Sequence, residues 1–276
     1  MDLTTIDDLK AALRLAGVRS NKALGQHFLV DREVVAAMVA AGELTSSDTV
    51  LEVGPGLGVM TGELTTAAGR VVAVELDPVL AGLLRRDAPP NVEVVQADIR
   101  RFDLRRLPVG YKVVANIPYY LTAPLLRRLV TSPNQPRLAA LLVQQEVAQR
   151  ITASPGQMSV LAVSVQYYAR PALLQVVTAD KFWPPPKVDS AIVQLRMRDR
   201  PAFAADAAVL FRLVKAGFGE RRKMLKNSLA GGLRIEAAQA VELVAAAGLS
   251  PTARAQELSL EDWERLYSAS TEAHRL

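Results

Sequence analysis

The sequence predicts an α/β protein with a mainly parallel sheet, followed by a smaller, wholly helical region. Between residues 49 and 151, short apolar segments rich in valine alternate with helical segments. Strands joined by helices run parallel and are covered on both faces. After residue 200 the chain is rich in alanine and leucine and has helical spacing. We therefore expect two domains, residues 1–200 and residues 201–276.

Two helices are expected before the first strand. Residues 1–17 carry apolar side chains at helical spacing, and residues 31–42 form a second helical segment with Asp31 as its N-cap. The segment between them contains glycine and polar residues, which predicts a loop with an exposed Phe28-Leu29 pair.

Five apolar segments are predicted to be the strands of the first domain. They are TVLEVG (49–54), RVVAVELD (70–77), VEVVQAD (92–98), KVVANIP (112–118) and LAALLVQ (138–144). Residues 158–197 have a different pattern, which predicts mainly extended segments that close one edge of the sheet.

Composition excludes several kinds of site. The chain has no cysteine, which excludes disulfides and thiolate metal sites, and its two histidines, His27 and His274, cannot form a histidine-rich metal site. We expect no bound metal. The acidic N-terminus is not typical of a signal peptide, and no apolar run reaches the roughly 18 residues of a membrane helix. These features predict a cytoplasmic protein without membrane contact, and the net charge of +5 weakly favours a polyanionic partner.

A glycine-rich turn separates the first predicted strand from a helix. Gly54, Gly56 and Gly58 let the backbone turn tightly and approach a ligand closely. Such a turn alone is more often a structural junction. Here Glu75 and Asp98 end the next two strands, where carboxylates can bind ribose hydroxyls and the amine of adenine. Together these features predict a site for an adenosine-containing cofactor.

The spacing within the turn favours one such cofactor. The glycines form G-x-G-x-G, whereas nicotinamide cofactors prefer G-x-G-x-x-G with phosphates at the helix start. Glu52, inside the first strand, would repel a pyrophosphate. A ligand with a cationic amino-acid end fits better, and we therefore predict S-adenosylmethionine.

The fourth predicted strand ends in an unusual segment, VVANIPYY (113–120). The Asn116 side-chain oxygen and the Ile117 carbonyl can accept hydrogen bonds from an aromatic amine, which increases charge on its nitrogen as a methyl group arrives. Pro118 makes the turn rigid, and Tyr119 offers a face on which a base can stack. The segment is typical of a clamp for a flipped-out adenine. The alternative is that Asn116 caps the helix that begins near residue 122.

The order of these segments resembles that of the ribosomal RNA adenine N6-dimethyltransferases. The segments that carry the resemblance are LEVGPGLG (51–58), VELD (74–77), QADI (96–99) and NIPYY (116–120). Further segments are similar to the small-subunit branch, the KsgA/RsmA (Dim1-like) 16S rRNA dimethyltransferases. They are NKALGQHFLVD (21–31), FWPPPKVDSAIVQL (182–195), GFGERRKMLKNSL (217–229) and RAQELSLEDWERL (254–266).

The resemblance covers roughly residues 20–266 and implies a Rossmann-like, class I methyltransferase sheet with a helical C-terminal domain. It implies that S-adenosylmethionine is contacted by His27, Leu29, Gly54, Glu75, Asp98 and Asn116. The family often has asparagine at the position of His27, where a backbone contact would survive the change. Phe182 matches an aromatic residue that would enclose the adenine opposite Tyr119, and the alternative is a core phenylalanine at a loop.

A basic cluster follows residue 219. It consists of Arg221, Arg222, Lys223 and Lys226, which we expect to lie within about one and a half turns of a helix. We expect this cluster to contact RNA phosphates. The alternative is a solvated surface. Arg127, Arg128 and Lys187 are candidates to extend the basic surface.

The resemblance implies N6,N6-dimethylation of two adjacent adenosines near the 3′ end of 16S rRNA, in the 30S subunit or its precursor. We expect a monomer without an obligate protein partner. One alternative is the related 23S rRNA methyltransferase that confers macrolide resistance. Another is a non-catalytic ribosome-assembly or transcription factor on the same scaffold, although every cofactor and clamp residue is intact. A nicotinamide-dependent dehydrogenase is a distant third.

Overall fold

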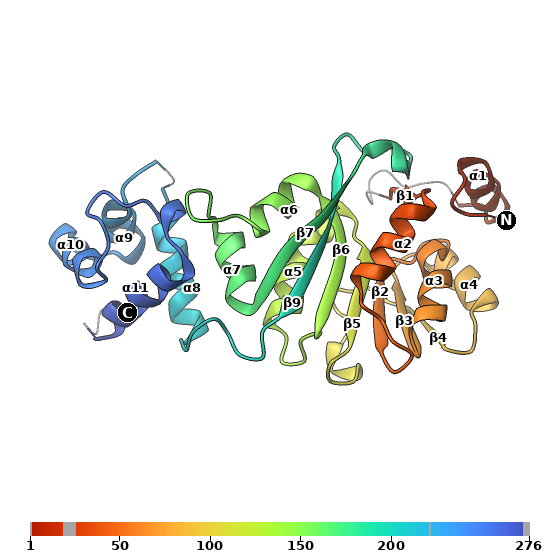
Figure 1. Ribbon diagram of the computed structural model, residues 1–276, viewed down its shortest axis with the longest axis horizontal. Helices are drawn as coiled ribbons and strands as arrows, with labels where there is room; N and C mark the ends of the chain where they lie inside the picture. Colours follow the sequence, from red (N-terminus) through yellow and green to blue (C-terminus); the bar gives the residue numbers. More distant parts are fainter. Residues whose placement is uncertain (1, 19–25, 221, 273–276) are drawn as a thin grey trace. The chain divides into compact units, whose positions relative to one another are not determined.

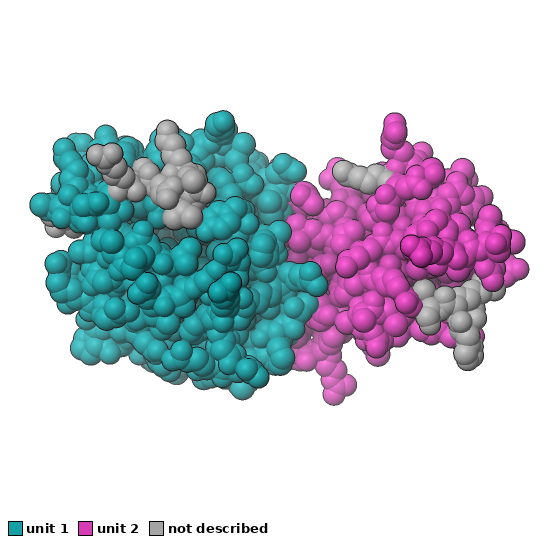
Figure 2. All heavy atoms as spheres, turned by 180° about the vertical axis from the view of Figure 1, so that it is seen from behind, with its two compact units in different colours: residues 1–148, 171–197 teal, residues 149–170, 198–276 magenta. Residues whose placement is uncertain are grey.

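The structure is a computed structural model that describes residues 2–18, 26–220 and 222–272. The chain divides into two compact units, which Figure 2 colours teal and magenta. The first comprises Met1–Ala148 and Pro171–Met197, and the second Gln149–Arg170 and Arg198–Leu276. The second unit therefore includes a segment that precedes the boundary expected near residue 200.

Figure 1 labels the helices and strands of the chain. In the first half they are α1 (Ile6–Leu15), β1 (Phe28–Leu29), α2 (Arg32–Ala41), β2 (Thr49–Val53), α3 (Val59–Ala67), β3 (Arg70–Glu75), α4 (Pro78–Asp87), β4 (Val92–Gln96), β5 (Lys112–Asn116), α5 (Thr122–Thr131) and β6 (Leu138–Gln144). They are followed by α6 (Gln145–Ile151), α7 (Val160–Tyr168), β7 (Ala169–Val177), β8 (Phe182–Trp183), β9 (Ser190–Met197), α8 (Ala207–Gly217), α9 (Leu225–Leu233), α10 (Ala237–Ala246) and α11 (Leu260–Glu272).

The strands β2 to β6 confirm the five predicted strands and form most of one sheet. Its order is β4-β3-β2-β5-β6-β9-β7. The five strands are parallel to their neighbours among themselves, and β9 pairs antiparallel with β6. From β2 the chain adds β3 and β4 on one side and then crosses to β5 and β6 on the other. Ligands bind at such a switch point, beyond the carboxyl ends of the strands.

The central strands β2, β5 and β6 are buried on both faces of the sheet, to which successive residues point alternately. Val50, Val114 and Leu142 pack in one apolar cluster with residues of α2 and α3. Their neighbours Leu51 and Val113 point to the opposite face and are also fully buried. The sequences of strands that are covered on both faces are continuous apolar runs, and for this reason the sequence pattern predicted them.

Two expectations about local structure are wrong. Val160–Tyr168 was expected to be extended but is helix α7, which begins with Ser159 as an N-cap whose hydroxyl accepts from the Ala162 N–H. The Phe28-Leu29 pair was expected to be exposed but is buried. It forms β1, which pairs antiparallel with Phe182–Trp183 of β8.

The second unit is helical. Helices α7 to α11 contribute to one apolar cluster, in which Trp263 is fully buried and stacks on Phe218 with ring centroids 5.7 Å apart. The packing of α7 residues such as Tyr167 into this cluster explains why a segment rich in valine is helical here. In the described part of the chain, no helix has the length and apolar character needed to cross a membrane.

Replacing Gly69 with alanine should destabilise the fold. A Cβ at residue 69 would lie 2.2 Å from the carbonyl oxygen of Ser46, so the backbone would have to move. We expect a loss of about 1–3 kcal/mol in unfolding free energy, measured by urea denaturation. The control is Gly62→Ala inside α3, where the added methyl meets nothing within 4 Å and should stabilise by about 0.5–1 kcal/mol. Equal effects of the two substitutions would contradict this account.

Candidate active site

One cavity lies at the carboxyl ends of the parallel strands and brings together almost all of the predicted site residues. Those that line it are His27, Leu29, Gly54, Gly56, Glu75, Asp98, Asn116, Ile117, Pro118, Tyr119 and Phe182. Gly58 is the exception. The cavity also has residues that sequence reasoning did not select, among them Glu52, Phe28, Leu76, Ile99 and Tyr120.

The glycine-rich turn forms one wall. Gly54, Gly56 and Gly58 have φ of 67°, 59° and 86°, in the left-handed region that favours glycine. A Cβ at Gly56 would lie 3.2 Å from the Phe28 ring, and one at Gly58 would lie 2.7 Å from Leu84. Gly58 therefore shapes the turn and the start of α3 without lining the cavity.

The carboxylate of Glu75 closes the turn from the neighbouring strand. Its two oxygens accept hydrogen bonds from the N–H groups of Gly56 (3.0 Å) and Asp77 (2.9 Å). The residue is only 6% exposed, and this burial raises the pKa of Glu75, while the two backbone donors act in the opposite direction. Glu75 thus ties β3 to the glycine turn at the rim of the cavity.

A second carboxyl group, that of Glu52, lies deeper in the cavity. The residue is 0% exposed, and the Thr61 hydroxyl donates to its Oε2 at 2.6 Å. No described residue bonds to Oε1. Burial raises the pKa of Glu52 to about 8, and the charge of Glu75 adds to the effect. A carboxylate within an otherwise apolar strand is the sequence signal for this residue, and in the sequence it argues against a pyrophosphate and for a ligand with a cationic end.

Asp98 lies two residues after β4 and lines the cavity beside an arginine. The Arg100 guanidinium contacts both carboxylate oxygens, at 2.6 and 3.0 Å, and the Arg100 N–H donates to Oδ1 at 2.9 Å. The hydrogen bonds from Arg100 lower the pKa of Asp98. The carboxylate is therefore ionised and oriented at neutral pH.

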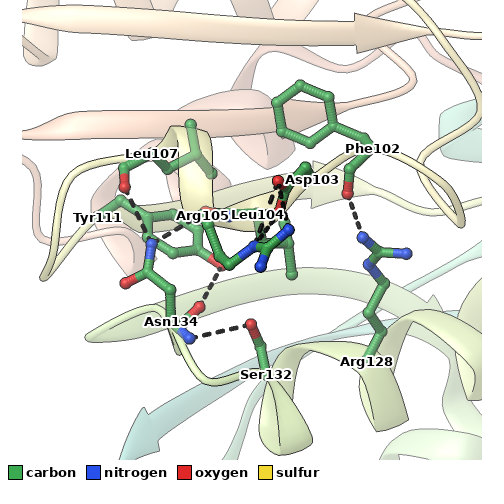
Figure 3. A network of polar contacts seen from close by, with 9 residues as sticks. All are labelled: Phe102, Asp103, Leu104, Arg105, Leu107, Tyr111, Arg128, Ser132 and Asn134. Atoms are coloured by element: carbon green, nitrogen blue, oxygen red, sulfur yellow. Dashed lines mark hydrogen bonds and ion pairs between the residues drawn. The ribbon is translucent and has the colours of Figure 1, made fainter.

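The segment after Asp98 is fastened to the region around α5, as Figure 3 shows. The Arg128 guanidinium donates to the carbonyl of Phe102, and the Asn134 side chain donates to the carbonyl of Leu107 at 2.9 Å. Arg128 was a candidate for the basic surface. Its guanidinium donates to the backbone carbonyls of Arg100 and Phe102.

The clamp segment is held by the N-terminal part of the chain. Asn116 Nδ2 donates to the carbonyl of His27 at 3.1 Å, which leaves Oδ1 as the acceptor of the amide, and no hydrogen bond from a described residue reaches it. The His27 ring donates to the Pro184 carbonyl at 2.7 Å and stacks on Tyr119, with centroids 5.6 Å apart. Asn116 does not cap α5, because the N-cap of that helix is Leu121 and makes no side-chain hydrogen bond.

The two predicted aromatic residues differ in their surroundings. The Tyr119 hydroxyl bonds to the Ser190 hydroxyl at 2.8 Å, and burial raises the pKa of Tyr119. Phe182 is 2% exposed and packs in the apolar cluster of α2 and α3, yet it also lines the cavity. The pairing of β1 with β8 places Phe182 opposite Leu29.

The predicted basic cluster belongs to the second unit. Arg221 lies outside the described residues. Arg222 and Lys223 are exposed and precede α9, so the cluster does not lie on one helix as expected, and Lys223 pairs with Glu220 at 2.7 Å. Lys226 lies in the first turn of α9 and is half-buried.

Comparison with known proteins identifies the family. Residues 17–272 match the family model for ribosomal RNA adenine dimethylase. The chain belongs to the ribosomal RNA adenine dimethylase family. A relative from Dehalococcoides mccartyi, "Ribosomal RNA small subunit methyltransferase A", is 41% identical, covering 92% of this chain and 90% of the relative. A protein of the same name from Pelotomaculum thermopropionicum is 39% identical over 96% of each chain.

Solved structures agree with the fold. The 23S rRNA methyltransferase ErmE is 31% identical and superposes with a TM-score of 0.72, covering 88% of this chain and 98% of ErmE. A dimethyladenosine transferase from Plasmodium falciparum has a TM-score of 0.80 at 24% identity, covering 90% and 98% of the two chains. The α/β methyltransferase fold followed by a helical region is therefore confirmed.

Members of this dimethylase family use S-adenosylmethionine, and the cavity fits that cofactor. The fit rests on two observations of the structure. Gly54 and Gly56 line the cavity without a side chain, and Glu52, which also lines it, has a buried carboxyl oxygen without a partner among the described residues, as a cationic ligand requires.

Glu52→Gln should flatten the pH dependence of stability in the ligand-free protein. The pKa of Glu52 is raised from 4.5 to about 8, so the folded chain holds a proton that the unfolded chain releases. The pH-dependent contribution of Glu52 to stability is therefore greatest below pH 4.5 and falls by about 1.4 kcal/mol per pH unit up to about pH 8. Urea denaturation from pH 5 to 9 should show this slope in the difference between wild type and variant. A constant difference would contradict the raised pKa.

Proposed function

We propose that this protein is the 16S rRNA adenine dimethyltransferase of its organism, which adds two methyl groups to N6 of each of two adjacent adenosines near the 3′ end. The observation that carries the proposal is the orientation of Asn116 in the cavity, with Nδ2 on the His27 carbonyl and Oδ1 free to accept. An acceptor there suits an exocyclic amine better than any charged nucleophile.

The walls of the cavity suggest how the cofactor is held. Glu75 would bind the ribose hydroxyls and Asp98 the adenine amine, while the turn of Gly54 and Gly56 would lie against the amino-acid portion. The segment around His27 and Leu29 covers the site from the N-terminal side. When bound, S-adenosylmethionine supplies a methyl group activated by its sulfonium.

The clamp would act on the nucleophile. The adenine N6 amine is weakly nucleophilic because its lone pair is delocalised into the ring. Hydrogen bonds from N6 to Asn116 Oδ1 and the Ile117 carbonyl favour localisation of charge on the nitrogen as the new bond forms. Tyr119 and Phe182 would enclose the base, and the ordered turn at Pro118 keeps the acceptors in place.

The small-subunit assignment rests on the relatives. The two relatives described above, both named small-subunit methyltransferase A, are 41% and 39% identical to this chain, whereas the 23S rRNA methyltransferase ErmE is 31% identical. Both groups belong to one fold, so the cavity alone does not separate them. We propose the 30S subunit or its precursor as the partner, with a monomeric enzyme in the cytoplasm and no obligate protein partner.

The second unit would supply RNA contacts. Arg222 and Lys223 are exposed, and Lys226 follows them at the start of α9. We propose that these side chains, with Arg221, track the phosphates of a folded RNA. A shape-recognising surface of this kind agrees with the absence of any base-reading motif in the sequence.

Transfer of labelled methyl groups tests the proposed function. Unmethylated 30S subunits and protein-free 23S rRNA are each incubated with the protein and labelled S-adenosylmethionine, then digested to nucleosides. We expect labelled dimethyladenosine from the 30S sample alone. Label in the 23S sample would reassign the enzyme, and binding of S-adenosylmethionine without label in either sample would favour an assembly factor.

Asn116→Ala should lower the rate of methyl transfer by about 10²–10³-fold, since one acceptor of the transition state is lost. Cofactor affinity, measured by calorimetry, should change far less. Tyr120→Phe serves as the control, because it retains an aromatic ring at the neighbouring position on the cavity wall. An Asn116→Ala enzyme with unchanged turnover would exclude the clamp.

Charge reversal at Arg222 and Lys226 should weaken RNA binding and reduce its salt dependence. Loss of two phosphate contacts lowers the slope of log K against log salt by about 1.4–1.8. Binding is measured by filter retention between 50 and 300 mM salt. Arg86→Glu with Arg105→Glu gives the same change in net charge on the first unit and should leave the slope nearer to wild type. Equal slopes for both double variants would show a general charge effect.

A further inference from the structure

We propose that Ser190 and the His27 ring are positioning residues, which together fix the orientation of the Tyr119 ring on which the target base stacks. The inference deepens the proposed function, on which it rests, because it concerns the same adenine clamp. Ser190 does not belong to the lining of the cavity, so it acts on a base only through another side chain.

The first restraint holds the hydroxyl end of Tyr119. The hydroxyls of Tyr119 and Ser190 are joined by a hydrogen bond of 2.8 Å, and Ser190 is 0% exposed. Ser190 is the first residue of β9 and pairs with Gln144 of β6, so the sheet fixes its backbone. The Tyr119 hydroxyl lies on the axis about which the ring turns. The hydrogen bond therefore fixes the direction of this axis but leaves rotation about it free.

The second restraint acts on the plane of the ring. The His27 ring stacks on Tyr119 with centroids 5.6 Å apart and planes inclined by 29°. An aromatic neighbour on one face opposes rotation about the ring axis, because rotation would push the edge of one ring into the other. The two contacts are complementary, since Ser190 sets the axis of the Tyr119 ring and His27 sets the rotation about that axis.

Both restraints depend on the segment that joins β8 to β9. This segment begins with Phe182, which would enclose the base opposite Tyr119. The carbonyl of Pro184 accepts a hydrogen bond from the His27 ring at 2.7 Å, and Ser190 lies at the end of the segment. One segment thus supplies one aromatic wall of the clamp and the supports of the other wall.

A fixed ring bears on the rate of methyl transfer because the reaction requires a defined alignment of nitrogen and methyl carbon. A Tyr119 ring that turned freely would hold the base in many orientations. Only some of them would place the N6 amine at Asn116 Oδ1. Loss of either restraint should therefore lower kcat more than it affects cofactor affinity or KM.

Methyl transfer to unmethylated 30S subunits tests the first restraint. Ser190→Ala should lower kcat by about 3–10-fold, which corresponds to one hydrogen bond, and leave the KM for the subunit close to that of wild type. Tyr119→Phe keeps the ring but loses the same bond, so it should have the same effect. The double variant should lose no more activity than either single variant, because both substitutions remove one interaction.

Ser270→Ala is the matched control. Ser270 is also 0% exposed, and its hydroxyl donates to the Tyr267 carbonyl at 2.6 Å, but it lies in α11 of the second unit. This variant should keep the kcat of wild type although it also removes the hydrogen bond of a buried serine. Urea denaturation shows that both serine variants are folded under the conditions of the assay.

Two substitutions of His27 test the second restraint. His27→Ala removes both the stack on Tyr119 and the hydrogen bond to Pro184, and it should lower kcat by about 3–10-fold. His27→Phe keeps an aromatic ring and should lose less activity. Both variants retain the backbone carbonyl that accepts from Asn116, so calorimetry should find cofactor affinity close to that of wild type.

The outcomes separate this inference from the proposed function. Unchanged kcat in Ser190→Ala, multiplied losses in the double variant, or an equal loss in Ser270→Ala would overturn the role of Ser190. Unchanged kcat in His27→Ala, or a fall matched by a loss of cofactor affinity, would overturn that of the His27 ring. None of these results affects methyl transfer by the wild type.

Two further outcomes concern the proposed function. Label in 23S rRNA instead of 30S subunits would overturn the small-subunit assignment alone, and the same variants would then be compared on 23S rRNA. Wild-type protein that methylates neither RNA would overturn both the proposed function and the positioning roles.

Discussion

The parallel register of four adjacent strands is the constraint on which the site depends. Because β4, β3, β2 and β5 run in the same direction, their carboxyl ends form one edge of the sheet. The chain reverses its direction of strand addition between β2 and β5, so the glycine turn and Asn116 lie on adjacent strands there. Glu75 joins them from the other neighbour of β2 through its hydrogen bond to Gly56. Each turn positions one functional group, and the register of the parallel strands brings these groups together in one site.

A second, smaller pairing completes the cavity. The two-residue strand β1 comes from the N-terminal part of the chain, and its partner β8 lies more than half the chain length later. This pairing brings Phe28, Leu29 and Phe182 against the wall formed by the parallel strands. Contacts between segments so far apart in the chain carry a loop-closure cost, which the packing of both segments against the parallel strands offsets. The residues of β1 and β8 that line the cavity are thus joined to each other by backbone pairing.

The sequence predicted the structure correctly where the spacing of apolar residues and the position of a residue at a strand end determine it. Buried parallel strands are continuous apolar runs, so β2 to β6 and the groups at their ends were predictable, and eleven of the twelve distinct cavity residues proposed lie on its lining. It failed where tertiary packing decides. The valine-rich segment of α7 is helical because its residues pack among other helices, and Phe28 is buried because β8 covers it. The carboxyl group of Glu52 within an apolar strand is apparent from the sequence. Its burial and the lack of a described partner for its Oε1 depend on the surrounding fold.

The backbone of Ile117 also bears on how long the enzyme lasts. Spontaneous deamidation of an asparagine requires the amide nitrogen of the next residue to attack the side-chain carbonyl. The Ile117 N–H donates to the Leu142 carbonyl at 3.2 Å, and the Asn116 amide is held by the His27 carbonyl. Neither reacting group can turn towards the other without breaking a hydrogen bond of the sheet or of the N-terminal segment. The asparagine that we propose as the acceptor for the adenine amine therefore lies where deamidation is slowed by the same hydrogen bonds that orient its side chain.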